Sequence, residues 1–250
     1  MRKRKRRSVY LLPNLLTSMS LFGGFYAMVA TLDQRFTQAS IAIFASCILD
    51  ALDGRVARMT NSTSRFGVEY DSLADVIAFG VAPGLLAYMW ALKGFGRFGW
   101  LAAFLYVACG ALRLARFNVQ AETVQKKHFL GLPIPAAAAT IAASVLFFGE
   151  FHVPVEVKKV FAPILMYALG FLMVSAVRYS SFKESSAFRS RHFEAVVAVI
   201  LLFVIVLIEP AVMLFAITMA YMLSGPVFYA FKYIFRSRAV LGEATRSKET

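Results

Sequence analysis

Apolar residues run along this chain in long stretches, and short segments that carry charge or a turn-forming residue separate them. A helix that crosses a membrane needs about 20 mostly apolar residues. The pattern predicts eight such helices, at roughly residues 10–32, 37–57, 72–92, 98–117, 132–150, 160–177, 193–209 and 211–232. Pro210 separates the last two, because proline does not continue a helix. The expected fold class is therefore an all-α, polytopic helical membrane protein.

Composition supports this class and excludes others. Hydrophobic residues make up 59% of the chain and charged residues 16%, and the mean hydropathy is +0.65. A soluble domain usually carries about 25% charged residues, and a disordered chain is poor in apolar ones. Outer-membrane barrels give only weak, alternating hydropathy. The two cysteines, Cys47 and Cys109, lie inside apolar stretches and predict neither a disulfide nor a zinc site.

The net charge of +13 could indicate nucleic-acid binding, but the distribution of the basic residues fits a membrane better. With eight spans, 22 of the 27 lysines and arginines fall on one side, including the run at residues 2–7. The other five lie opposite: Arg35, Lys93, Arg97, Lys158 and Lys159. Because basic residues concentrate on the cytoplasmic side, both termini are expected there. We expect no nucleic-acid partner.

Three regions follow from this topology. Residues 1–9 form a basic cytoplasmic N-terminus, residues 10–235 form the membrane domain, and residues 236–250 form a polar, mobile cytoplasmic tail. The expected location is the cell (inner) membrane. Since no sizeable soluble domain is expected, any chemistry must lie among the helices or at their cytoplasmic ends.

Four aspartates interrupt the second and third apolar stretches. Asp50 and Asp53 are three residues apart, and Asp71 and Asp75 are four apart, so each pair shares one helical face. A carboxylate inside a membrane is costly and is a functional candidate by default. A short loop joins the two helices, so the four carboxylates can converge near the cytoplasmic surface. Oxygen ligands without His or Cys predict Mg²⁺, Mn²⁺ or Ca²⁺, and two ions about 4 Å apart are usual in phosphoryl chemistry.

A structural alternative is that these aspartates pair with Arg55, Arg58 and Arg65 and only hold the hairpin together. Four carboxylates at helical spacing favour the metal site instead. Gly54 lets a ligand approach the backbone, and Arg58 lies one turn further, where its guanidinium can meet a phosphate.

The pattern Asp50-x2-Asp53-Gly54-x2-Ala57-Arg58-x8-Gly67-x3-Asp71-x3-Asp75 resembles the signature of the CDP-alcohol phosphatidyltransferase family. The resemblance implies that the four aspartates hold two divalent ions, which bind the pyrophosphate of a CDP-linked lipid. It implies that Asp75 is also the general base for the acceptor alcohol. It further implies a set of residues that bind CDP: Asn14, Thr17, Gly54, Arg58 and Ser64.

Three other segments resemble the bacterial and archaeal phosphatidylserine synthase branch of this family. They are the runs 113–118, 131–136 and 181–183, and the N-terminal run 12–17 is also typical of this branch. The implied reaction converts CDP-diacylglycerol and L-serine to phosphatidylserine and CMP, and the family resemblance suggests a homodimer. Arg113, Arg116 and Arg178 are candidates for the serine carboxylate. Ordinary anchoring of Arg113 and Arg116 at a cytoplasmic helix end is the alternative.

Other functions stay open at this point. A sibling transferase would use glycerol 3-phosphate, inositol phosphate or choline as acceptor, and choline would need an aromatic cage. A divalent-cation transporter would also place aspartates in a helical bundle. Its permeation site should lie in mid-membrane, whereas these aspartates are expected near one face.

Overall fold

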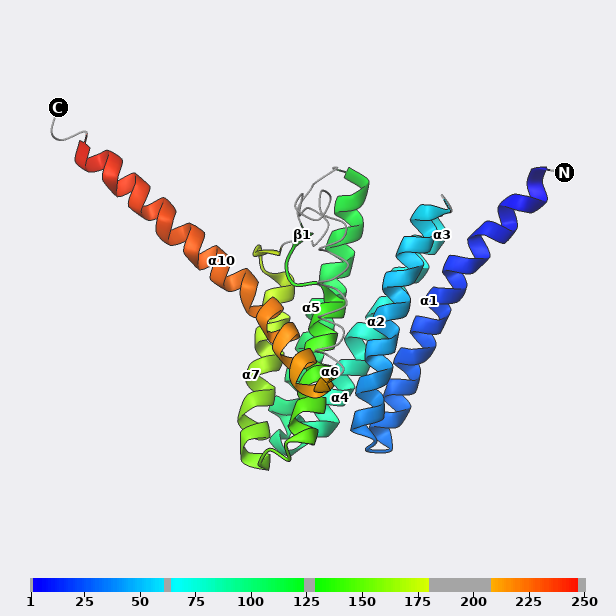
Figure 1. Ribbon diagram of the computed structural model, residues 1–250, viewed down its shortest axis with the longest axis horizontal. Helices are drawn as coiled ribbons and strands as arrows, with labels where there is room; N and C mark the ends of the chain where they lie inside the picture. The colour runs from blue at the N-terminus through cyan, green and yellow to red at the C-terminus, as the bar shows by residue number, and fades with distance from the viewer. Residues whose placement is uncertain (1, 61–63, 124–128, 180–207, 247–250) are drawn as a thin grey trace.

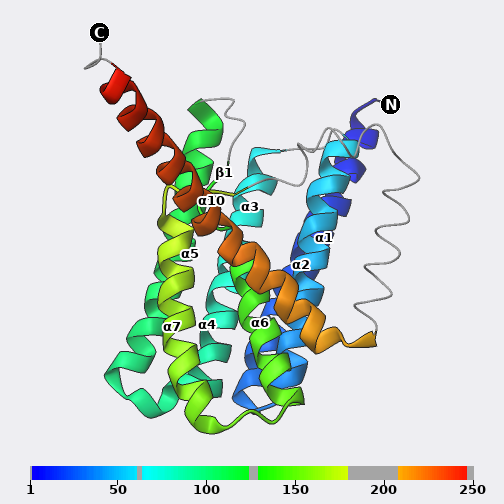
Figure 2. The same ribbon diagram turned by 60° about the vertical axis from the view of Figure 1, so that its left-hand side comes forward.

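The computed structural model describes residues 2–60, 64–123, 129–179 and 208–246. These residues form a bundle of helices (Figures 1 and 2). In chain order the elements are α1 (Arg2–Leu32), α2 (Phe36–Met59), α3 (Arg65–Asp75), the π-helix η1 (Val76–Val81), α4 (Ala82–Ala87), the π-helix η2 (Tyr88–Leu92), the 3₁₀-helix η3 (Lys93–Phe95), α5 (Arg97–Thr123), β1 (Phe129–Leu130), α6 (Ile134–Glu150), α7 (Val155–Val174), β2 (Arg178–Tyr179) and α10 (Pro210–Arg246). The two strands have two residues each, so the all-α class is confirmed.

Five helical segments of the described chain are long and apolar enough to cross a membrane: Leu12–Leu32, Arg65–Phe95, Arg97–Val119, Val155–Val174 and Pro210–Tyr229. Ile134–Glu150 is a shorter apolar helix. Helix α2 coincides with the expected span 37–57 but carries the charged signature residues. The expected span 193–209 lies almost entirely outside the described residues. A polytopic helical membrane protein is therefore confirmed, while the count of eight spans stays a prediction.

The bundle has a core rich in small residues, which also holds large side chains such as Tyr106 and Phe79, and an outer surface rich in large apolar ones. Its core is rich in alanine, with Ala27, Ala39, Ala78 and Ala137 fully buried. Many large apolar side chains on the outer surface are exposed, among them Phe171 at 76%. Membrane helices pack this way, because lipid solvates large apolar side chains while small residues let backbones approach closely.

Helices α1 and α2 form the tightest pair near the site. Ser20 Oγ donates to Ser46 O at 3.1 Å, and Ser46 Oγ donates to Ser20 O at 3.0 Å. Gly24 lies against η1, where a Cβ would be 2.5 Å from Ala78 Cα. These contacts fix the rotation of α1 about its axis. Thr17, one turn before Ser20, therefore faces α2.

The third span begins earlier than the pattern predicts, at Arg65 rather than at residue 72. The reason is local, since Ser64 caps the helix by accepting a hydrogen bond from the Gly67 backbone N–H. The span then changes to π-helix directly after Asp75. A π-helical turn inside a longer helix is rare and is often found at a functional site.

The ends of the later helices are tied together at the same end of the bundle as the start of α3 (Figure 1). Strands β1 and β2 pair antiparallel, with Phe129 opposite Tyr179 and Leu130 opposite Arg178. Gly131 follows with a φ of +80°, and a Cβ there would collide with Met173 O, so only glycine fits. Helix α10 continues through Arg246, beyond the expected domain end at residue 235, and the proposed division into domains stays a prediction.

Candidate active site

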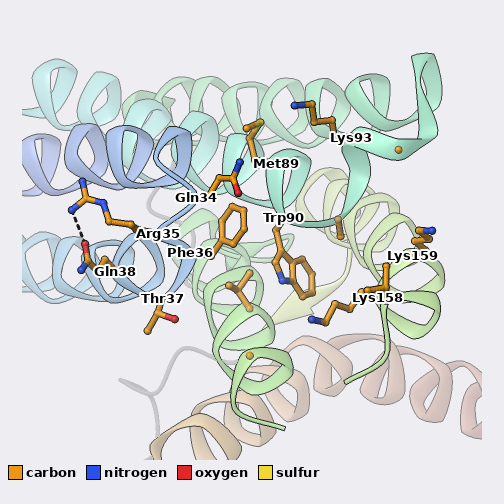
Figure 3. Close-up of a pocket in the computed structure, with 15 residues that line it drawn as sticks. Gln34, Arg35, Phe36, Thr37, Gln38, Met89, Trp90, Lys93, Lys158 and Lys159 are labelled. Carbon is orange, nitrogen blue, oxygen red and sulfur yellow. Dashed lines mark hydrogen bonds between the residues drawn. The ribbon is translucent and has the colours of Figure 1, made fainter. Parts of the chain in front are cut away.

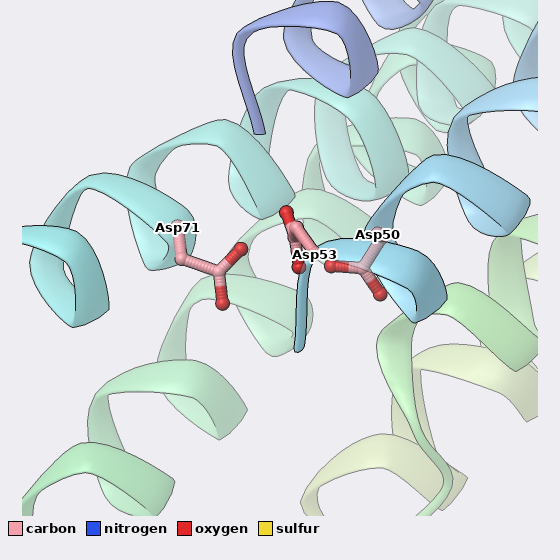
Figure 4. Close-up of side chains that lie close together, drawn as sticks. All are labelled: Asp50, Asp53 and Asp71. Carbon is pink, nitrogen blue, oxygen red and sulfur yellow. The ribbon is translucent and has the colours of Figure 1, made fainter. Parts of the chain in front are cut away.

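Three of the four predicted metal ligands meet at the end of the α2–α3 hairpin. One carboxylate oxygen each from Asp50, Asp53 and Asp71 lies within 4.8 Å of the others (Figure 4). Asp71 Oδ1 is buried and has no hydrogen-bond partner in the described part of the chain. Three oxygen ligands this close, one of them unpaired, fit a hard divalent cation, because carboxylates without a cation between them repel.

The fourth aspartate borders this group. Asp75 lies one turn after Asp71, on the same face of the helix. The charges of Asp50, Asp53 and Asp71 all act on it. No arginine forms an ion pair with these aspartates among the described residues, where the single ion pair joins Arg35 to Asp33 at the other end of the bundle. Arg58 interacts with Asp53 only electrostatically.

Helix α1 holds Asp53 in position. Thr17 Oγ1 lies 2.8 Å from Asp53 Oδ2 and 3.1 Å from Pro13 O, and both side chains are buried. The resemblance assigned Thr17 to CDP binding, whereas its hydroxyl here supports a metal-ligand candidate. Sequence analysis missed this contact, since residues 36 positions apart leave no local signal.

A cavity of about 190 Å³ opens beside the carboxylates. All five residues assigned to CDP by resemblance line it, together with Asp53 and Asp71: Asn14, Thr17, Gly54, Arg58 and Ser64. The Arg58 guanidinium lies over Gly54, because a Cβ at position 54 would be 3.4 Å from Arg58 Nη1. A cation and a bare stretch of backbone thus face the same space, as phosphate binding requires.

The N-terminus of α3 lies at the same cavity. The Gly67 N–H donates to Ser64 Oγ at 3.0 Å, which leaves the Ser64 hydroxyl proton available to a ligand. A Cβ on Gly67 would be 3.1 Å from Ser64 Oγ and 3.4 Å from Asn14 Oδ1, so glycine lets α1 approach. Tyr70 and Ser18 share a hydrogen bond of 2.8 Å across the same helix pair. Helix N-termini favour anions, since free N–H groups and the helix dipole point at them.

The three arginine candidates for serine binding differ. Arg113 is partly buried; its Nε has no hydrogen-bond partner within the described residues, and it interacts electrostatically with Asp75 and Tyr221. Arg116 is exposed, with Nη1 3.5 Å from Val174 O. Arg178 lies in β2, and its side chain is outside the described residues. The structure therefore brings Arg113 toward the carboxylates and leaves Arg116 at the surface.

Sequence analysis gave no role to two further contacts. Asn118 Nδ2 donates to Ser72 Oγ at 2.9 Å and ties α5 to α3 between Asp71 and Asp75. Tyr221 of α10 lies beside Arg113, and its ring centroid is 5.6 Å from that of Tyr179. Both contacts join helices distant in sequence, so no spacing rule could have found them.

Comparison with known proteins gives the family. A family model described as CDP-alcohol phosphatidyltransferase matches residues 10–175. A CDP-diacylglycerol–serine O-phosphatidyltransferase of Helicobacter pylori is 48% identical over 177 residues, which cover 70% of this chain and 74% of that protein. The archaetidylserine synthase of Methanothermobacter thermautotrophicus is 38% identical over 183 residues, covering 72% and 73%. A CDP-diacylglycerol–serine O-phosphatidyltransferase of Mycobacterium leprae is 33% identical over 234 residues, covering 90% and 77%. The chain belongs to the CDP-alcohol phosphatidyltransferase family.

Proposed function

We propose that this protein transfers the phosphatidyl group from CDP-diacylglycerol to the hydroxyl of L-serine, giving phosphatidylserine and CMP. The observation that carries the proposal is the convergence of Asp50, Asp53 and Asp71 beside one cavity that all the nucleotide candidates line. The names of the relatives support serine as acceptor, since the bacterial ones name serine and the archaeal one names a serine-headed lipid.

Asp50, Asp53, Asp71 and Asp75 are the proposed ligands of two divalent cations, Mg²⁺ or Mn²⁺, with Ca²⁺ as a third candidate. Bound cations would neutralise the pyrophosphate of the donor and the charge that develops on departing CMP. The protein's own contribution is to hold the oxygens in place, as Thr17 does for Asp53.

The cavity beside the carboxylates would take the nucleotide side of the donor. Arg58 faces it with a positive charge and Ser64 with a hydroxyl group, and Gly54 has no side chain that would block the approach. Phosphoryl transfer depends mainly on such positioning and charge neutralisation.

Asp75 is the proposed general base. The serine oxygen attacks the phosphorus of the phosphatidyl group, the bond from that phosphorus to the CMP oxygen breaks, and the serine proton passes to Asp75. An alcohol needs a base within hydrogen-bonding reach of its proton. Asp75 interacts electrostatically with Arg113, so the acceptor would bind between the two.

Arg113 is the proposed partner of the serine carboxylate, because its Nε is buried without a partner in the described chain. Arg113→Gln should raise the KM for serine roughly ten- to a hundredfold, because the loss of one charge-assisted hydrogen bond weakens binding by about that factor. Arg116→Gln, on the exposed face of the same helix, is the matched control and should leave this KM unchanged. A normal KM for serine in both variants would give both arginines a topological role and leave Arg178 as the remaining candidate.

A serine-transfer assay tests the whole proposal. The purified protein in detergent, with CDP-diacylglycerol, radiolabelled serine and Mn²⁺, should form labelled phosphatidylserine. Asp71→Asn should abolish the product, while Glu69→Gln, which removes an exposed carboxylate from the same helix, should not. Formation of product only with glycerol 3-phosphate, inositol phosphate or choline would identify a sibling transferase and refute the serine assignment.

Two further features belong to this proposal. The site would face the cytoplasm from the cell (inner) membrane, which the distribution of basic residues supports. The functional unit would be a homodimer, as the family resemblance suggests. A cation transporter is disfavoured, because the described carboxylates gather in one group rather than along a path through the bundle (Figure 4).

A further inference from the structure

A second, larger cavity lies at the opposite end of the bundle from the aspartates. Its volume is about 630 Å³, and the α1–α2 turn, η2, η3 and the start of α7 surround it (Figure 3). Gln38 lines it from α2, and the helical rise puts Gln38 roughly 22 Å from Asp53 along that helix. A cavity of this size can take a small molecule or a lipid headgroup.

The lining of this cavity is strongly cationic. It includes Arg35, Lys93, Lys158 and Lys159 and no aspartate or glutamate. Arg35 pairs with Asp33 at 2.6 Å and donates to Gln38 at 3.0 Å. Within the described residues, none of the three lysines makes an ion pair or a side-chain hydrogen bond, so the cavity holds uncompensated positive charge.

This concentration is unexpected for its side of the membrane. The topology puts only five basic residues on that side, and four of them line this one cavity. They come from three separate segments of the chain, the α1–α2 turn, η3 and α7. Arg97, the fifth basic residue expected on this side, does not line the cavity. The few basic residues expected on this side are therefore concentrated around one cavity.

The remaining lining is apolar and aromatic. Trp90 and Phe36 lie between the cationic groups (Figure 3), and Trp90 packs edge-on against Phe148 with ring centroids 5.5 Å apart. Tryptophan at the end of a membrane helix favours the headgroup level of the bilayer. Basic pockets between membrane helices at that level suit anionic headgroups.

We propose that this cavity binds the phosphate-bearing headgroup of an anionic phospholipid from the leaflet opposite the active site. The lysines would contact the phosphate, and Trp90 and Phe36 would lie against the glycerol and the first carbons of the acyl chains. A free phosphate ion would use the lysines but gain nothing from the aromatic side chains. Because the cavity offers both lysines and aromatic side chains, it should bind a phospholipid in preference to a free phosphate ion.

Trp90 allows a direct binding test in the full-length protein. The sequence has two tryptophans, so Trp100→Phe leaves Trp90 as the single tryptophan, whose fluorescence can be excited selectively over that of tyrosine. In bilayers that contain brominated phosphatidylglycerol, Trp90 fluorescence should be quenched at lower lipid fractions than with brominated phosphatidylcholine. The readout is independent of transferase activity, so it separates this proposal from the proposed function.

Removal of the lysine charges should abolish the preference for phosphatidylglycerol over phosphatidylcholine. Lys93→Gln, Lys158→Gln and Lys159→Gln combined should lower the preference for phosphatidylglycerol about tenfold or more, since each lysine near a membrane surface contributes about fivefold. Arg97→Gln, which removes a charge from the same side outside the cavity, should keep it. An unchanged preference in the triple variant, or an equal loss with Arg97→Gln, would overturn the proposal. Inorganic phosphate at millimolar concentration that abolishes the preference would identify a free-anion site and also overturn it.

Discussion

Thr17→Val offers a sharp test of how the carboxylate group is held. The substitution keeps the size and branching of the side chain and removes only the hydroxyl, which lies 2.8 Å from Asp53 Oδ2. Thr17 and Asp53 are each 4% exposed, so water cannot easily replace the lost donor. A hydrogen bond to a charged group contributes about 1.5–3 kcal/mol, which corresponds to roughly ten- to a hundredfold in an equilibrium constant.

The loss should fall on cation binding, because Thr17 contacts a ligand candidate and not the reacting atoms. Residues that orient a metal ligand typically change metal affinity by about ten- to a hundredfold. In the serine-transfer assay, the Mn²⁺ concentration for half-maximal rate should rise about tenfold or more in Thr17→Val. Saturating Mn²⁺ should restore most of the rate, and Thr17→Ser should behave as the wild type.

Thr31→Val is the matched control for this experiment. Thr31 is a buried threonine of the same helix, and its hydroxyl donates to Ala27 O at 2.7 Å, far from the aspartates. Its removal should leave the Mn²⁺ dependence unchanged. A Thr17→Val midpoint within twofold of the wild type, or an equal shift in Thr31→Val, would refute the reasoning that Thr17 positions Asp53.

Three further predictions concern the chemistry, the topology and the packing. Asp75→Asn should lower kcat about a hundredfold or more while the KM for CDP-diacylglycerol changes much less; a change confined to that KM would remove Asp75 as the base. In a cysteine-free background, Met59→Cys should react with an impermeant thiol reagent only from the cytoplasm and Gly94→Cys only from outside; the reverse result would invert the topology. Gly24→Ala should destabilise the protein in thermal unfolding by about 1–3 kcal/mol, because its Cβ would lie 2.5 Å from the backbone of η1. Gly149→Ala, with open space around it, is the control. Equal melting temperatures of the two variants would contradict the packing of Gly24 against η1.

The sequence by itself determined the fold class and the composition of the site. Long apolar stretches leave helices as the available spanning structure here, because each backbone polar group must be satisfied within its own segment. Helical spacing places Asp50 and Asp53 on one face of their helix and Asp71 and Asp75 on one face of theirs. A short connection makes the two helices neighbours. Those local rules predicted four converging carboxylates, and three of them, Asp50, Asp53 and Asp71, form one group in the structure.

Helix boundaries were less well determined. The hydropathy pattern started the third span at residue 72, whereas the helix begins at Arg65, because capping by Ser64 and not apolarity decides where a helix starts. The change to π-helix after Asp75 was likewise absent from the pattern, since it is a property of hydrogen bonding along the packed helix.

Only the tertiary structure decided which distant residues share a contact. The Thr17–Asp53 bond, the approach of Arg113 to Asp75 and the gathering of lysines around the far cavity each join segments separated by many residues. The rotation of each helix about its axis sets such contacts, and that rotation follows from packing at positions such as Gly24 and Ser46, which a one-dimensional pattern does not encode. Sequence spacing could therefore predict what lies on one helix face, and packing decided what that face meets.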